Sequence, residues 1–192
     1  MRCKVLAALP VILLSTSQLS SVKAQPASRT SLSYYAVTGD TLADLRRDMM
    51  RKGPRSEGGI GYGMTTVRPG KKMSVAACKS IGRYAFDAEF VIILPRLATD
   101  AKLSAAERQQ FSGFVGFVKR HEETHRSIWM KYIARAERDF RAAATADCAQ
   151  AHTRAMRLWQ AMMANCRQIH TAFDKQQRGP LRSHPFIKTA KR

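Results

Sequence analysis

The sequence predicts an α+β fold, in which a small antiparallel or mixed sheet with an N-terminal helix precedes a long helical hairpin. Two observations carry this prediction. Short β-prone or apolar runs, separated by Gly and Pro, fill the chain up to Pro95, whereas a helical period of apolar residues dominates positions 104–173. A break in that period at residues 145–147 divides the helical part into two arms.

The N-terminal half is expected to contain one helix and several strands. Residues 41–52 should form the helix, because Thr41 can cap it, with Asp44 three residues later, and Gly53-Pro54 stops it. The unbroken apolar run Phe90–Leu94 is typical of a central strand buried on both faces. The other expected elements are strands at residues 34–37, 64–68, 75–78 and 84–94, a turn at Pro69-Gly70 and a loop at residues 55–63.

The C-terminal half is expected to form the hairpin. Ser104 and Glu107 have the spacing of a capping box, which begins a helix that should run towards Ala144. A second helix is expected at residues 148–173. The basic segment at residues 175–192 has no acidic side chain and is expected to be a mobile end.

The first 24 residues have the layout of a cleaved secretory signal: a positive start, the apolar run Val5–Leu14 and a small-x-small site at Val22-Lys23-Ala24. The apolar run is too short to span a bilayer. We therefore expect a secreted or periplasmic protein, cleaved near Ala24, with no transmembrane segment in the mature chain; the alternative is a retained N-terminal anchor. The expected divisions are 1–24 signal peptide, 25–33 flexible mature N-terminus, 34–179 a single domain and 180–192 a basic tail.

The formal net charge is +19, and removal of Arg2, Lys4 and Lys23 with the signal lowers it to +16. This charge favours anionic partners such as envelope components. Nucleic acid is not expected, because the protein is predicted to be exported and its basic residues are scattered through the helices. A solvated basic surface accounts for that scatter.

Three cysteines follow the signal: Cys78, Cys148 and Cys166. In an oxidising compartment this count suggests one disulfide and one free thiol. Cys166 has apolar neighbours in a helical pattern and is expected to be buried and free. A bridge between Cys78 and Cys148 would tie the two halves of the chain together, although the sequence does not prove that pairing.

The segment His121-Glu122-Glu123-Thr124-His125 has the pattern H-E-x-x-H. Residues four apart lie on the same helix face, so His121 and His125 can bind one zinc ion. Glu122, about 100° further round the helix, would act as general base on a metal-activated water. The alternative is a surface helix with two incidental histidines, but the motif falls inside a capped helix, which is the geometry that metal binding requires.

A catalytic zinc usually takes three protein ligands and a water. Glu137 and Asp139 lie too far along the same helix to reach the ion. If the chain reverses near residues 146–147, antiparallel packing brings His170 opposite the two histidines, with Asp174 one turn later on the same face. Either of these two could ligate the metal while the other orients it or contacts substrate; the alternative is an ordinary interface histidine and a helix-end acid.

A set of further residues forms a pattern together with the motif. It comprises Tyr34-Tyr35, Val37, Gly39, Thr41, Leu45, Met49 and Gly53-Pro54, then Cys78 and Leu94-Pro95-Arg96, then His121-Glu122, His125, Cys148, Asn165 and Phe173-Asp174. Over residues 34–179 this pattern resembles the DUF922 family, bacterial exported proteins described as predicted zinc-dependent proteases.

The resemblance implies zinc-dependent protease activity and supports the Cys78–Cys148 disulfide. It also implies a functional role for Asp174, because family members tend to carry an aromatic-Asp pair there. Asp174 is therefore the predicted third metal ligand, with His170 as runner-up. Members often continue into a Thr-x-His-Gly segment, whereas residues 175–179 of this chain read Lys-Gln-Gln-Arg-Gly.

The sequence thus predicts a secreted or periplasmic zinc-dependent peptidase of the H-E-x-x-H type, with Zn²⁺ as cofactor and a peptide or protein as substrate. One alternative is a non-catalytic cationic envelope protein that binds anionic partners on the same scaffold. Another is a small cationic toxin or cell-wall hydrolase that applies the same zinc chemistry to peptidoglycan peptides.

Overall fold

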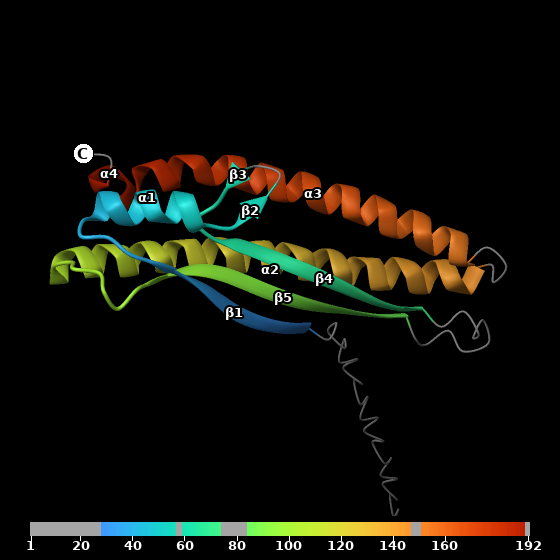
Figure 1. The fold of residues 1–192 in the computed structure, drawn as a ribbon. Coiled ribbons are helices and arrows are strands. Elements are labelled where there is room, and N and C mark those ends of the chain that lie inside the picture. Colours follow the sequence, from blue (N-terminus) through green and yellow to red (C-terminus); the bar gives the residue numbers. More distant parts are fainter. Residues whose placement is uncertain (1–27, 57–58, 74–83, 147–150, 191–192) are drawn as a thin grey trace, which may run out of the picture.

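The computed structural model describes residues 28–56, 59–73, 84–146 and 151–190 and has the predicted α+β architecture. A three-stranded mixed sheet, a short N-terminal helix and the long hairpin α2–α3 make up most of it (Figure 1). The elements in order are β1 (Ser28–Val37), α1 (Leu42–Lys52), β2 (Arg55–Ser56), β3 (Gly59–Ile60), β4 (Met64–Met73), β5 (Tyr84–Leu97), α2 (Ala105–Ala146), α3 (Ala151–Ser183) and α4 (Pro185–Thr189).

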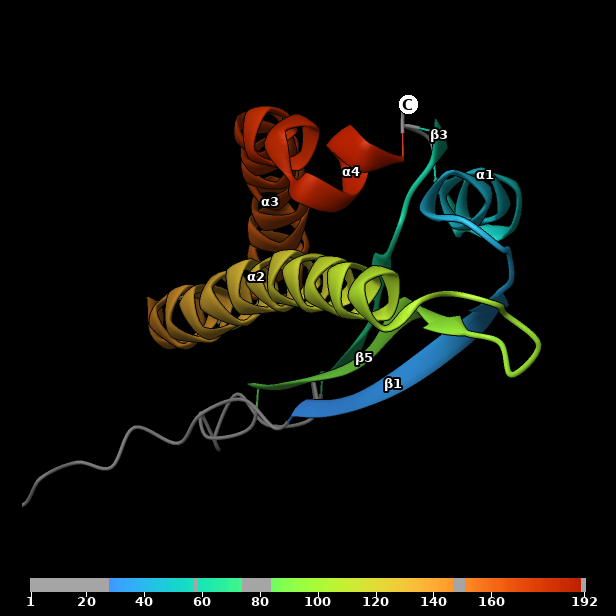
Figure 2. The ribbon, with the colours of Figure 1, turned by 90° about the vertical axis from the view of Figure 1, so that its left-hand side faces the viewer.

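The sheet has β5 at its centre. β1 runs parallel to β5 on one side and β4 antiparallel on the other. Phe90, Ile92 and Leu94 are each 1% exposed, which confirms that this run forms the central strand. Val91 and Ile93, which point the other way, are only partly buried, because α2 and α3 lie on one side of the sheet (Figure 2).

The strands are longer than predicted. Pro69 and Gly70 do not form the expected turn but lie inside β4. β4 is an edge strand, where the missing N–H of proline need not cost a ladder hydrogen bond. Pro95 lies inside β5 and pairs with Tyr35 of β1. It has no partner in β4, because the first residue of that strand, Met64, pairs with Ile93. Part of the expected loop at 55–63 forms the two-stranded ribbon β2–β3, and the predicted strand at 75–78 lies outside the described residues.

Both predicted helix starts are confirmed. Thr41 Oγ1 accepts the backbone N–H of Asp44 at 3.2 Å. The Ser104 N–H donates to Glu107 Oε2 at 3.0 Å, while the Glu107 N–H donates to Ser104 Oγ at 3.3 Å. These reciprocal bonds are those of a capping box, and they begin α2 where the sequence indicates.

The C-terminal segment is not the expected mobile end over the residues described. α3 continues to Ser183, and α4 then folds back against the N-terminal part of α2. Phe186 is fully buried, with its ring centroid 4.5 Å from that of Phe114, and Ile187 is 3% exposed. These two apolar side chains within the basic segment dock it on the core, since their burial removes apolar surface from water.

The core consists of two clusters along α2. One packs the first half of α2 against α1, α4 and the end of β5, and the other packs its second half against α3 and the middle of β5. The H-E-x-x-H segment lies between Val118 of the first cluster and Trp129 of the second. Both histidines are therefore held on a helix that is anchored on either side of them.

Cys166 belongs to the second cluster and is buried and free, as predicted. Burial raises the pKa of its thiol to about 11. The proposed partners Cys78 and Cys148 lie outside the described residues. Among the helices that the structure describes, none combines the length and the apolar character that crossing a membrane requires.

Gly63, just before β4, allows this strand to approach α2 closely. A Cβ atom at this position would lie 2.5 Å from Val118 Cγ1 and 3.2 Å from Glu122 Cγ. Gly63→Ala is expected to lower the free energy of unfolding by about 1–3 kcal/mol, because overpacking displaces both side chains. Urea unfolding followed by circular dichroism measures this change.

Gly113→Ala is the matched control. This glycine is exposed in α2, and a Cβ at this position would meet nothing within 4 Å beyond its chain neighbours and the adjacent backbone of its own helix. Its substitution should raise the free energy of unfolding by about 0.5–1 kcal/mol, because alanine favours the helix. Equal stabilisation by both substitutions would show that β4 does not approach α2 as described.

Candidate metal centre

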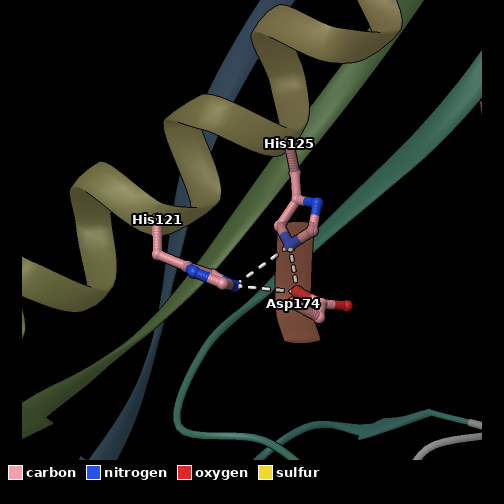
Figure 3. A group of neighbouring side chains, drawn as sticks. All are labelled: His121, His125 and Asp174. Carbon is pink, nitrogen blue, oxygen red and sulfur yellow. Dashed lines mark hydrogen bonds and ion pairs between the residues drawn. The ribbon is translucent and has the colours of Figure 1, made fainter. Parts of the chain in front are cut away.

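Three side chains from the two arms of the hairpin converge on one point. His121 and His125 extend from α2, and Asp174 extends from α3 (Figure 3). His125 Nε2 lies 3.0 Å from His121 Nε2 and 2.9 Å from Asp174 Oδ1, and His121 Nε2 lies 3.2 Å from the same oxygen. The structure therefore brings together the two predicted histidine ligands and the predicted third ligand.

The local structure explains this convergence. The two histidines are one helical turn apart on the same face of α2. The antiparallel packing of α3 sets Asp174 beside them, and the preceding Phe173 contacts both rings. Its ring centroid lies 4.8 Å from that of His121, on which it stacks, and 5.1 Å from that of His125. Phe173 therefore restricts the orientation of both imidazoles.

The spacing of the three atoms suits a metal ion. In a tetrahedral site with bonds of about 2.0–2.1 Å, ligand atoms lie roughly 3.3 Å apart. The three distances here are 2.9, 3.0 and 3.2 Å, close to that value. Two imidazole nitrogens and one carboxylate oxygen also form a donor set that metal ions accept. This group could thus hold a metal ion.

The site is partly open to solvent. The side chains of His121 and His125 are 20% and 13% exposed, whereas that of Asp174 is 52% exposed. Partial burial acts to raise the pKa of Asp174, but hydrogen bonds with His121 and His125 outweigh it and bring the pKa below its usual range. Asp174 is therefore a carboxylate at neutral pH, the form that a metal ligand requires.

Glu122 differs from its neighbour Glu123 in its surroundings. Glu122 is 5% exposed, and Thr65 Oγ1 of β4 lies 2.9 Å from its Oε2 atom. Burial raises the pKa of Glu122, against the lowering effects of this hydrogen bond and of the nearby histidines. Glu123 is exposed and faces Lys119 at 3.7 Å. Only Glu122 therefore has the buried, oriented carboxylate that a general base needs.

His170 does not belong to the group of three ligand atoms. Its Nδ1 lies 2.6 Å from Nδ1 of His125, on the side of that ring away from Asp174. Burial and the charge of His125 lower the pKa of His170 to about 4, despite the opposing effect of Asp174. Its Nε2 is buried and has no hydrogen-bond partner among the described residues. His170 thus contacts a predicted ligand through the nitrogen that the metal would leave free.

These residues line a cavity of about 660 Å³ between α2, α3 and the segment from β2 to β4. The lining also contains apolar side chains, among them those of Phe117, Val118, Trp129 and Leu181. A cavity of this size is in the usual range for small-ligand sites. The candidate metal group therefore lies in a cavity large enough to admit a small ligand.

Sequence analysis missed the contribution of the sheet to this site. Thr65 and Gly63 come from an edge strand and its approach, and neither carries a local pattern that indicates a contact with Glu122. Residues that share one helix face can be recognised from the sequence, because they are only three or four positions apart. A contact between residues 57 positions apart depends on how the sheet and α2 pack, which no short motif encodes.

Comparison with known proteins confirms the family that the resemblance indicates, without assigning it an activity. A protein-family model described as "Bacterial protein of unknown function (DUF922)" matches residues 32–181. Neither the curated proteins nor the solved structures contain a match. Because the matched region covers most of the chain and includes every residue of the candidate metal centre, the chain belongs to the DUF922 family.

Proposed function

We propose that this protein is a zinc-dependent peptidase that acts outside the cytoplasm after loss of residues 1–24. The observation that carries the proposal is the triangle of His121 Nε2, His125 Nε2 and Asp174 Oδ1, whose sides measure 2.9–3.2 Å. Its position in a cavity beside a buried glutamate adds the groups that a hydrolase requires.

Zinc is the metal that fits these donors best. Imidazole and carboxylate ligands in a three-residue set are common in catalytic zinc sites, which keep a fourth position open. When bound, zinc acts as a Lewis acid that acidifies water and polarises a carbonyl group. His121, His125 and Asp174 would hold the ion at the wall of the cavity that they line, where water and substrate could reach it.

Glu122 is the proposed general base. Its carboxylate lies next to the histidines, lines the cavity and is held by Thr65. A buried carboxylate with a raised pKa accepts a proton from water more readily than an exposed one. Glu122 can then donate that proton to the leaving amine, while Thr65 keeps its carboxylate in one orientation.

His170 is the proposed positioning residue for His125. If His125 binds metal through Nε2, its Nδ1 must carry the proton, and the 2.6 Å contact makes His170 Nδ1 the acceptor. The remaining proton of neutral His170 is then on Nε2, the buried atom for which the described residues offer no partner. The cost of this unpaired donor is consistent with a role in metal binding rather than in stability.

The purified protein is expected to bind one zinc ion per chain, as measured by mass spectrometry of metals after dialysis. His125→Ala and Asp174→Asn should each weaken binding by more than about 100-fold, because ligand loss exceeds the effect of losing a supporting contact. Asp139→Asn is the control, since this acid pairs with Arg135 elsewhere on α2. Undiminished affinity in both ligand variants would exclude this site.

His170→Leu is expected to weaken zinc binding by about 10–100-fold, since it removes the acceptor that orients His125. The same substitution should change the stability of the metal-free protein little, because it removes the bond to His125 but also a buried donor that the described residues leave unpaired. His170→Asn places an amide oxygen near the position of Nδ1 and should retain most of the affinity. A purely structural His170 would instead show a loss of stability in both variants.

Glu122→Gln is expected to keep one zinc per chain and to slow peptide hydrolysis by about 100–10,000-fold, because general-base catalysis contributes that much. Glu123→Gln should leave the rate unchanged, since Glu123 faces solvent. Casein fragments and muropeptides are the substrates, and the faster of them distinguishes protein from peptidoglycan cleavage. Equal rates for Glu122→Gln and the wild type would rule out the proposed role of Glu122.

A further inference from the structure

We propose that the cavity selects substrates with a carboxylate close to the cleaved bond and that Arg178 binds this carboxylate. The inference rests on the proposed peptidase function and specifies its substrate class. Arg178 would be a specificity-determining residue, because it contacts the substrate beside the reacting atoms.

Arg178 is well placed for this contact. It lines the cavity and lies four residues after Asp174, one turn along α3, so that both side chains lie on the same side of the helix. Among the described residues that line the cavity, it is the only lysine or arginine. The structure gives it no hydrogen bond or ion pair with any described residue, and its side chain is exposed. Its guanidinium is thus free to bind a ligand.

The carboxylates of the cavity are already engaged. Among the described lining residues they belong to Glu122, which is held by Thr65, and to Asp174, which is held by the two histidines. The guanidinium fork matches a carboxylate and binds it with two parallel hydrogen bonds. A carboxylate supplied by the substrate therefore complements Arg178, and the net charge of +16 that remains without Arg2, Lys4 and Lys23 attracts such a substrate.

The apolar side chains that line the cavity with Arg178 indicate which kind of substrate residue carries or adjoins that carboxylate. Phe117, Val118 and Leu181 also line the cavity, and Leu181 follows Arg178 by three residues on the same side of α3. One helical turn separates Asp174 from Arg178, about 6 Å along α3, which corresponds to roughly two residues of extended peptide. An apolar residue just after the cleaved bond would fill the pocket, and a carboxylate on it or on the next residue would reach Arg178.

The carboxylate can be a chain terminus or an acidic side chain, and a binding experiment separates the two. The test uses the zinc-loaded full-length chain with Glu122→Gln, to prevent turnover, and Trp159→Phe, so that Trp129 in the cavity reports alone. The probes are N-acetyl-Ala-Phe, its C-terminal amide, N-acetyl-Ala-Phe-Glu amide and its Gln counterpart. Fluorescence titration gives their dissociation constants.

The free acid, the Glu peptide or both should bind about 10–100-fold more tightly than the neutral counterpart, as expected for a charged hydrogen-bonded pair. Arg178→Gln should remove this preference, whereas Arg182→Gln, an exposed arginine one turn further along α3 and outside the cavity lining, should keep it. Preference for the free acid alone identifies a terminal carboxylate, and preference for the Glu peptide alone identifies a side chain.

The inference is overturned if no probe binds, if acidic and neutral probes bind equally, or if Arg178→Gln retains the preference. Its failure can be told apart from failure of the proposed function. Hydrolysis of neutral peptides without any carboxylate preference would leave the peptidase intact and remove the role of Arg178. If the wild type bound carboxylates through Arg178 but hydrolysed no peptide, the role of Arg178 in binding would stand and the proposed peptidase function would fail.

Discussion

The antiparallel packing of α3 on α2 is the contact on which the candidate site depends. Neither helix carries a complete ligand set, since α2 supplies two histidines and α3 supplies the carboxylate and the supporting histidine. The second core cluster, with Cys166, Met162 and Phe140 buried between the arms, fixes the spacing and rotation of the two helices. A site at the interface of two packed helices is held more rigidly than one built on loops.

The sheet supplies a second constraint, which acts on Glu122 alone. A carboxylate that is 5% exposed is costly to bury unless it is hydrogen-bonded, and β4 meets this need through Thr65. The strand reaches α2 because Gly63 has no side chain at the crossing point. The two neighbouring acids of the motif therefore differ in burial and in hydrogen bonding for a tertiary reason, although they are adjacent in the sequence.

The polar groups of the site form a chain in which each orients the next. Asp174 contacts both histidines, His125 contacts His170, and Phe173 packs on the two ligand rings. Such chains fix the tautomer of each imidazole, since one nitrogen must donate and the other accept. Two imidazole nitrogens and one carboxylate oxygen held this closely form a group that could hold a cation at its centre.

The sequence by itself determined the features that rest on short-range order: the α+β class, the capped starts at Thr41 and Ser104, the central strand around Phe90–Leu94, and the hairpin that brings the region of His170 and Asp174 opposite the motif. The period of the helix carries this information, because residues four apart share a face in any helix. Only the tertiary structure decided that Asp174 lies with the two Nε2 atoms while His170 contacts the opposite side of His125, that Thr65 holds Glu122, and that Phe186 docks the basic C-terminal segment on the core. These outcomes depend on how α3 is rotated about its axis and on where the sheet crosses α2, which are set by the packing of the whole core and not by any local pattern.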